Sequence, residues 1–109
     1  MTISRPTKPK KSEAVQFLEK AAGGPLTFGR MLRSIRLGDD MSQAEFAARL
    51  GVSKAHLSDV ELGRRTVAPA RAWAWGKKLG YSPEQFVELA LEANLAKEGL
   101  QFRVRLEVA

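Results

Sequence analysis

The most informative part of this sequence is residues 41–66, which read MSQAEFAARLGVSKAHLSDVELGRRT. Ser42 and Glu45 have the spacing of a capping box, in which a serine and a glutamate three residues later bind each other's backbone N–H groups where a helix begins. Gly51 stands where such a helix needs a left-handed residue to end. Ser53 is positioned to cap a second helix. The stretch therefore predicts two short helices joined by a tight turn.

The apolar residues of this stretch indicate how the two helices pack. The predicted inward side chains are Phe46, Ala47 and Leu50 in the first helix, Val52 in the turn, and Leu57 and Val60 in the second. The small side chain of Ala47 faces the turn, so the second helix, residues 54–62, can cross the first, residues 43–50, closely. Two helices locked together in this way have the anatomy of a helix-turn-helix.

Three further helices are predicted by the residues at their ends. One begins after the N-cap Thr27 and stops at Gly38, and another has Pro69 in its first turn and closes at Gly80. The last opens at Ser82 and continues to about residue 97. The predicted fold class is therefore all-α, with five helices.

The two ends of the chain do not follow the helical pattern. Residues 1–11 contain four basic residues, no acid and two prolines, which favours a flexible basic tail, with a short helix as a further option at 12–22. After Gly99, apolar and polar residues alternate to the end of the chain, as in a half-buried strand. We therefore divide the chain into three parts: a basic tail (1–26), a helix-turn-helix domain (27–80), and a helix with a C-terminal strand (81–109).

Composition excludes several classes of function. The 109 residues include 18 Lys and Arg against 12 Asp and Glu, a formal net charge of +6, with no cysteine and one histidine. A disulfide framework, a thiolate metal site and a cysteine nucleophile are excluded, and no catalytic residues, metal or cofactor are expected. No apolar run is long enough for a membrane span and no signal peptide is apparent, so we expect a cytoplasmic protein. The positive charge favours an acidic partner such as nucleic acid.

The stretch 41–66 resembles the Cro/XRE family of DNA-binding domains. The matching features are Ser42-Gln43, Ala47, Leu50-Gly51-Val52-Ser53, Leu57-Ser58, Glu61 and Gly63-Arg64-Arg65. The resemblance extends over about residues 27–80 and leaves the tail and residues 81–109 outside it. A helical pair can also be nothing more than a packed core. The joint pattern and the basic charge favour double-stranded DNA as the partner.

The resemblance implies that residues 54–62 form the recognition helix, which enters the major groove N-terminus first. Projection at 100° per residue directs Leu57 and Val60 inward. The candidate base-reading residues are Ser53, Lys54, Ala55, Ser58, Asp59 and Leu62. Lys54 can donate to guanine, Ala55 can meet a thymine methyl, and Asp59 can accept from cytosine N4. Alternatively, Asp59 is a solvated residue that orients Lys54 or Arg65, and Lys54 is a solvated charge.

Phosphate contacts are expected from other positions. Gln43 opens the first helix of the pair, where N–H groups and the helix dipole attract an anion. Arg64 and Arg65 follow the second helix and can neutralise phosphates, with surface solubility as the alternative role. The basic residues of the tail either reach DNA as an arm or only aid solubility.

One pair of residues is predicted to have a structural role. The resemblance implies an ion pair between an arginine of the helix that follows Thr27 and a glutamate late in the recognition helix. Arg36 and Glu61 match those positions. We expect this pair to set the two helices against each other, so that breaking it affects stability more than base preference.

The C-terminal strand predicts a homodimer. The rest of the domain reads as helix, so the strand has no second strand in its own chain, and it can pair with its own copy across a two-fold axis. Its apolar row, the predicted dimer interface, is Leu100, Phe102, Val104, Leu106 and Val108. The alternatives are a frayed tail and a strand reserved for a different protein.

The predicted function is a sequence-specific DNA-binding transcriptional regulator, a dimeric repressor that occupies a pseudo-palindromic operator. The alternative is an antitoxin, which neutralises a partner toxin and represses its own operon. Residues 1–26 and the C-terminal strand would then contact the toxin.

Overall fold

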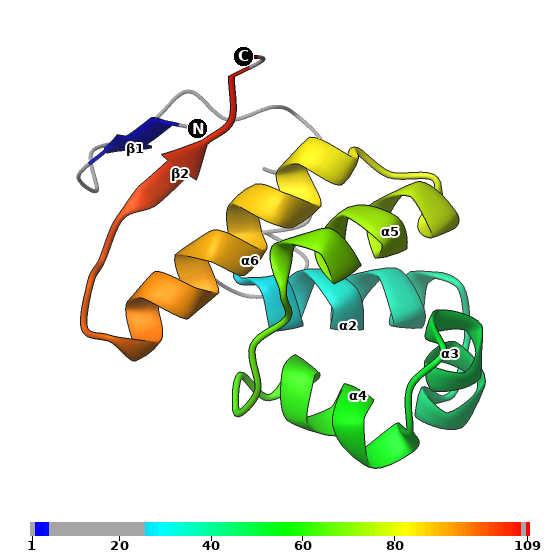
Figure 1. The fold of residues 1–109 in the computed structure, drawn as a ribbon. Coiled ribbons are helices and arrows are strands. Elements are labelled where there is room, and N and C mark those ends of the chain that lie inside the picture. The colour runs from blue at the N-terminus through cyan, green and yellow to red at the C-terminus, as the bar shows by residue number, and fades with distance from the viewer. Residues whose placement is uncertain (1, 5–25, 108) are drawn as a thin grey trace. The chain divides into compact units, whose positions relative to one another are not determined.

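The computed structural model describes residues 2–4, 26–107 and 109. The described residues divide into two compact units, one of residues 26–65 and one of residues 2–4 with 66–107 and 109. The described residues contain five helices and one two-stranded sheet, and Figure 1 shows each element with its label. The prediction of an all-α fold with five helices is confirmed.

The first unit contains three helices, α2 (Phe28–Gly38), α3 (Gln43–Leu50) and α4 (Lys54–Glu61). The side chain of Thr27 caps α2 by accepting from the N–H of Arg30 at 3.2 Å. The core of this unit consists of Phe28, Met31, Leu32, Ile35, Phe46, Ala47, Leu50, Leu57 and Val60, all buried. The side chains predicted to point inward from α3 and α4 are therefore the ones that pack, and Val52 in the turn is half-buried.

The second unit contains β1 (Thr2–Ser4), α5 (Pro69–Leu79), α6 (Pro83–Lys97) and β2 (Arg103–Arg105). Figure 1 shows α5 and α6 side by side, with β2 running back along α6. The two helices pack closely because Gly76 has no side chain. A Cβ atom at this position would lie 2.8 Å from the Cα of Pro83 and 3.1 Å from the ring of Phe86. Thus α5 groups with α6, whereas the sequence analysis assigned residues 27–80 to one domain.

The strand that ends the chain differs from its prediction in two ways. Regular strand geometry is limited to Arg103–Arg105, and its partner is β1 of the same chain, antiparallel, with Ile3 opposite Val104. The expectation that the strand has no partner in its own chain is wrong, because residues 2–4 of the predicted flexible tail supply one. The helix considered at 12–22 lies outside the described residues.

The other edge of β2 is occupied as well. The N–H of Val104 donates to Oε2 of Glu92 at 2.9 Å, and the N–H of Leu106 donates to Oε2 of Glu88 at 2.7 Å. Alternate N–H groups of a strand point to the same edge, and glutamates four residues apart on α6 have the spacing to accept from both. The carboxylates of Glu88 and Glu92 thus accept the hydrogen bonds that a third strand would accept along this edge.

Candidate nucleic-acid interface

The turn between α3 and α4 is defined by side-chain caps and one glycine. The hydroxyl of Ser42 accepts from the N–H of Glu45, and the N–H of Ser42 donates to Oε1 of Glu45, both at 3.1 Å. Gly51 ends α3 with φ of 76°, in the left-handed region where a side chain is strained. Ser53 accepts from the N–H of His56 at 3.0 Å and caps α4. These local features fix where α3 begins and ends and where α4 begins.

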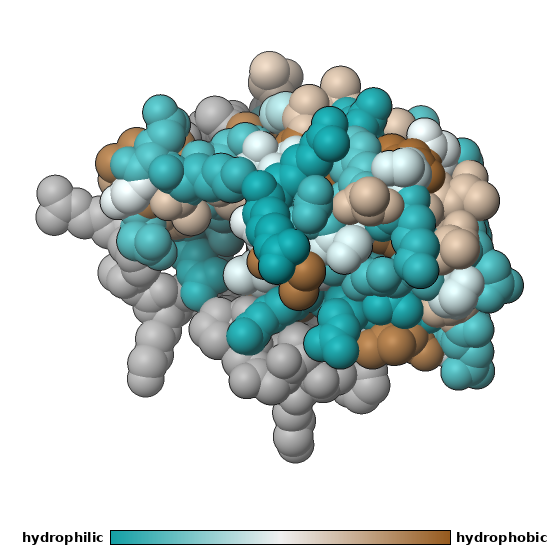
Figure 2. Space-filling model, turned by 90° about the horizontal axis from the view of Figure 1, so that it is seen from below, coloured by the Kyte–Doolittle hydropathy of each residue, from teal (hydrophilic) through white to brown (hydrophobic). Residues whose placement is uncertain are grey.

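The faces of α4 are separated as a DNA-reading helix requires. Leu57 and Val60 are buried, whereas Ser53, Lys54, Ala55 and Leu62 are exposed and Ser58 and Asp59 are half-buried. Leu62, an apolar side chain, is 62% exposed just after the helix ends. Figure 2 views the structure from the side on which α4 lies in Figure 1, and shows many hydrophilic residues with apolar residues among them.

The chain after α4 folds back onto Asp59. The N–H groups of Arg64 and Arg65 donate to the backbone oxygen of Asp59 at 2.8 and 3.2 Å. Nη1 of Arg64 also lies 3.8 Å from the Asp59 carboxylate, in an ion pair whose side chains are 71% and 45% exposed. Such a pair contributes little to stability. Arg64 thus partly offsets the negative charge of Asp59, whereas the alternative considered from the sequence was that Asp59 orients Lys54 or Arg65.

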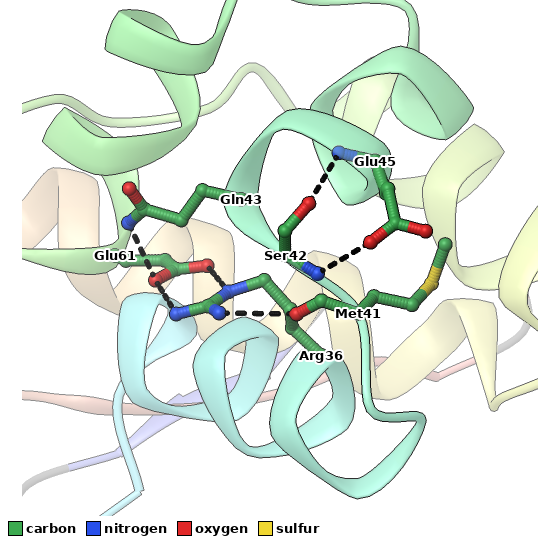
Figure 3. Close-up of polar contacts among 6 residues, drawn as sticks. All are labelled: Arg36, Met41, Ser42, Gln43, Glu45 and Glu61. Carbon is green, nitrogen blue, oxygen red and sulfur yellow. Dashed lines mark hydrogen bonds and ion pairs between the residues drawn. The ribbon is translucent and has the colours of Figure 1, made fainter.

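Arg36 and Glu61 lie together as a bidentate ion pair, shown in Figure 3. Nε of Arg36 donates to Oε2 of Glu61 at 2.8 Å, and Nη2 donates to Oε1 at 2.9 Å. Nη1 of Arg36 donates to the backbone oxygen of Met41 at 3.2 Å. The hydrogen bond to Glu61 is the main cause that raises the pKa of Arg36. The guanidinium therefore ties α2, the loop before α3 and the end of α4 into one arrangement.

The structure adds a contact that sequence reasoning missed. Nε2 of Gln43, at the start of α3, donates to Oε1 of Glu61 at 3.2 Å. The predicted phosphate-binding residue and the predicted ion pair thus form one network (Figure 3). These residues lie on different elements and far apart in the chain, so no local pattern signals the contact.

Comparison with known proteins identifies the family of this chain. The family model described as helix-turn-helix matches residues 32–86, which include α3, the turn and α4. The chain is a member of the Cro/XRE helix-turn-helix family. The control protein C.BamHI of Bacillus amyloliquefaciens is 31% identical to this helix-turn-helix protein over 70 residues, which cover 63% of this chain and 86% of that protein. No solved structure gives a significant match to the present chain.

Membership of this family makes the protein a DNA-binding transcriptional regulator. Within the part of the chain that the structure describes, no helix is long and apolar enough to span a bilayer.

Proposed function

We propose that this regulator is a repressor that binds a pseudo-palindromic operator as a dimer, with α4 in the major groove of each half-site. The observation that carries the proposal is the outward face of α4, where polar and small side chains surround Lys54 while the opposite face is buried. A helix so divided can enter a groove without disturbing the core that supports it. Occupancy of a promoter by such a protein blocks transcription.

The contacts divide into those that read bases and those that bind the backbone. Ser53, Lys54, Ala55, Ser58, Asp59 and Leu62 are the proposed base-reading set. Lys54 donates to guanine, Ala55 meets a thymine methyl, and Asp59 accepts from cytosine N4. Gln43, Arg64 and Arg65 are the proposed phosphate contacts. The hydrogen bonds that draw residues 64 and 65 back to Asp59 support this division, since they keep both arginines beside α4.

The dimer is proposed to use the apolar side chains of the C-terminal segment. Strand pairing across a two-fold axis no longer supports it, because both edges of β2 are occupied within the chain. What supports it is exposure of apolar surface in that segment. Leu100 is 43% exposed and Phe102 and Leu106 are half-buried, whereas Val104 is already covered. Val108 lies outside the described residues.

Selection of bound sites from random DNA, at a stated salt concentration, tests the function. A dimer should select two half-sites about one helical turn apart. The logarithm of the affinity should fall with the logarithm of salt concentration, with a slope of about −0.9 for each phosphate neutralised. Salt-independent binding, or recovery of no common site, would refute the proposal.

Two substitutions separate the proposed contact classes. Arg64→Ala should weaken binding to all sequences alike and reduce the salt slope by about one unit, because it removes a phosphate contact. Lys54→Ala should relax the preference at one base pair by about 1–3 kcal/mol. Lys97→Ala, at the exposed end of α6, is the control for loss of one positive charge and should leave base preference unchanged.

A further inference from the structure

We propose that Glu61 is a positioning residue for DNA binding: its buried carboxylate holds the amide of Gln43 in the orientation in which that amide contacts a phosphate of the DNA backbone. The proposal rests on the proposed function, which assigns Gln43 to a phosphate. It gives Glu61 a role beyond the ion pair with Arg36.

The Glu61 carboxylate is buried and accepts several hydrogen bonds. The side chain of Glu61 is 3% exposed. Oε2 accepts from Nε of Arg36, and Oε1 accepts both from Nη2 of Arg36 and from Nε2 of Gln43. A carboxylate has about four acceptor sites, and three of them are used by these donors. Gln43 is thus one of the groups that satisfy a buried charge.

The hydrogen bond to Glu61 fixes the orientation of the Gln43 amide. Its nitrogen faces the carboxylate (Figure 3). A flip would put the amide oxygen against Oε1 of Glu61, and two acceptors without a hydrogen between them repel. One amide hydrogen is therefore committed to Glu61. The second amide hydrogen is left as the donor for a phosphate oxygen.

The positive charge of Arg36 balances the negative charge of Glu61 in this network. A lone carboxylate beneath a phosphate contact would repel the DNA. The guanidinium of Arg36 lies 2.8 Å from Glu61 and offsets that charge, so the carboxylate can orient the amide without opposing the polyanion. Because folding already orders the Gln43 side chain, less conformational entropy is lost when DNA binds.

A double-mutant cycle on the full chain tests the proposal. The reference background replaces both Arg36 and Glu61 by Met, which removes the carboxylate without leaving a buried charge unpaired. In the natural background, Gln43→Ala should weaken binding to a selected operator about three- to tenfold, the range of one neutral hydrogen bond. The salt slope should not change, because glutamine carries no charge. In the double-Met background the same substitution should cost less than twofold.

A spectroscopic measurement without DNA separates positioning from a merely structural role. The side-chain ¹H–¹⁵N nuclear Overhauser effect of Gln43 should report a rigid amide in the natural chain and a mobile one in the double-Met background. Gln101, which is exposed, is the control and should be mobile in both. Thermal unfolding followed by circular dichroism shows that each variant is folded.

Three results would overturn the proposal: an equal cost of Gln43→Ala in both backgrounds, no cost in the natural one, or an amide equally mobile in both. Failure of the proposed function looks different, since the unsubstituted chain would then select no operator at all.

Discussion

At the scale of single residues, Gly29 determines how closely α2 approaches α4. A Cβ atom at this position would collide with the backbone oxygen of Val60 and would lie 2.7 Å from that of Glu61. The two helices therefore meet backbone to backbone. Two turns further along α2, the same approach brings Arg36 beside Glu61. No role was predicted for Gly29, although a glycine inside a helical pattern is a signal for close packing.

Substitution of this glycine tests the contact. Gly29→Ala should lower the free energy of unfolding by about 1–3 kcal/mol, since backbone atoms of α4 must shift to admit the methyl group. Gly38→Ala is the matched control in the same helix, where a Cβ atom would meet nothing within 4 Å. That variant should be as stable as the natural chain or more stable by up to about 1 kcal/mol. Urea unfolding measures the free energy of unfolding of both variants, and equal values would contradict the close packing of α2 on α4.

At the scale of elements, the start of α3 makes a pH-dependent contribution to stability. The pKa of Glu45 is lowered mainly because the backbone N–H of Ser42 donates to its carboxylate, and further because of the Ser42 side chain. A carboxyl group with a lowered folded-state pKa stabilises the fold at pH above its unfolded-state pKa, about 4.3. That contribution is lost as the pH falls through the folded-state value.

Glu45→Gln should therefore reduce stability at pH 7 and have progressively less effect as the pH is lowered below about 4.3. Urea unfolding of both chains between pH 7 and pH 3 measures the difference. Ser42→Ala is an informative companion, because it keeps the backbone donor that is the larger cause. In that variant an NMR titration should still give a lowered pKa for Glu45. If the stability difference between Glu45→Gln and the natural chain instead grew toward low pH, the assigned role of the Glu45 carboxylate would be contradicted.

The second element with a testable feature is β2. The backbone N–H of Val104 in β2 donates to Glu92 of α6, and that of Leu106, just after the strand, donates to Glu88. In the Glu88→Ala/Glu92→Ala variant both amides should exchange with solvent faster, because their acceptors are gone. Hydrogen exchange followed by NMR measures the two rates.

Glu98→Ala is the control for this experiment, since Glu98 is exposed just after α6. It should leave both exchange rates unchanged. Equal protection in the double variant and in the natural chain would mean that another group shields this edge of β2. An increase in oligomer size in the double variant would mean that an uncovered edge recruits a strand from a second chain.

At the scale of the whole molecule, the proposed dimer depends on the exposed apolar side chains of the C-terminal segment. Truncation after Gly99 should convert the proposed dimer to a monomer and remove most of the operator affinity, because both half-sites are then no longer bound together. Leu100→Asp should act in the same direction while keeping β2 in place. Leu37→Asp is the matched control, since Leu37 is 52% exposed on α2 and lies outside the proposed interface. Light scattering gives the oligomeric state, and a truncated chain that stays dimeric would move the interface to α6.

The helix ends and the inward faces could be read from the sequence, because each depends on residues within one or two turns of one another. The Ser42–Glu45 box, the left-handed Gly51 and the Ser53 cap are all local, and the structure has each of them. The division of α4 into a buried and an exposed face likewise follows from helical period alone. Arg36 and Glu61 were paired by resemblance to a family and not by any local rule.

Contacts between distant parts of the chain were decided by the tertiary structure. The amide of Gln43 reaches Glu61 across 18 positions of the sequence, the strand at residues 2–4 pairs with residues 103–105, and glutamates of α6 replace a strand along the other edge of β2. Nothing in the alternation of residues 100–109 specifies which group will accept a given N–H. A backbone donor is satisfied by whichever acceptor the fold brings within reach, and that depends on the path of the whole chain.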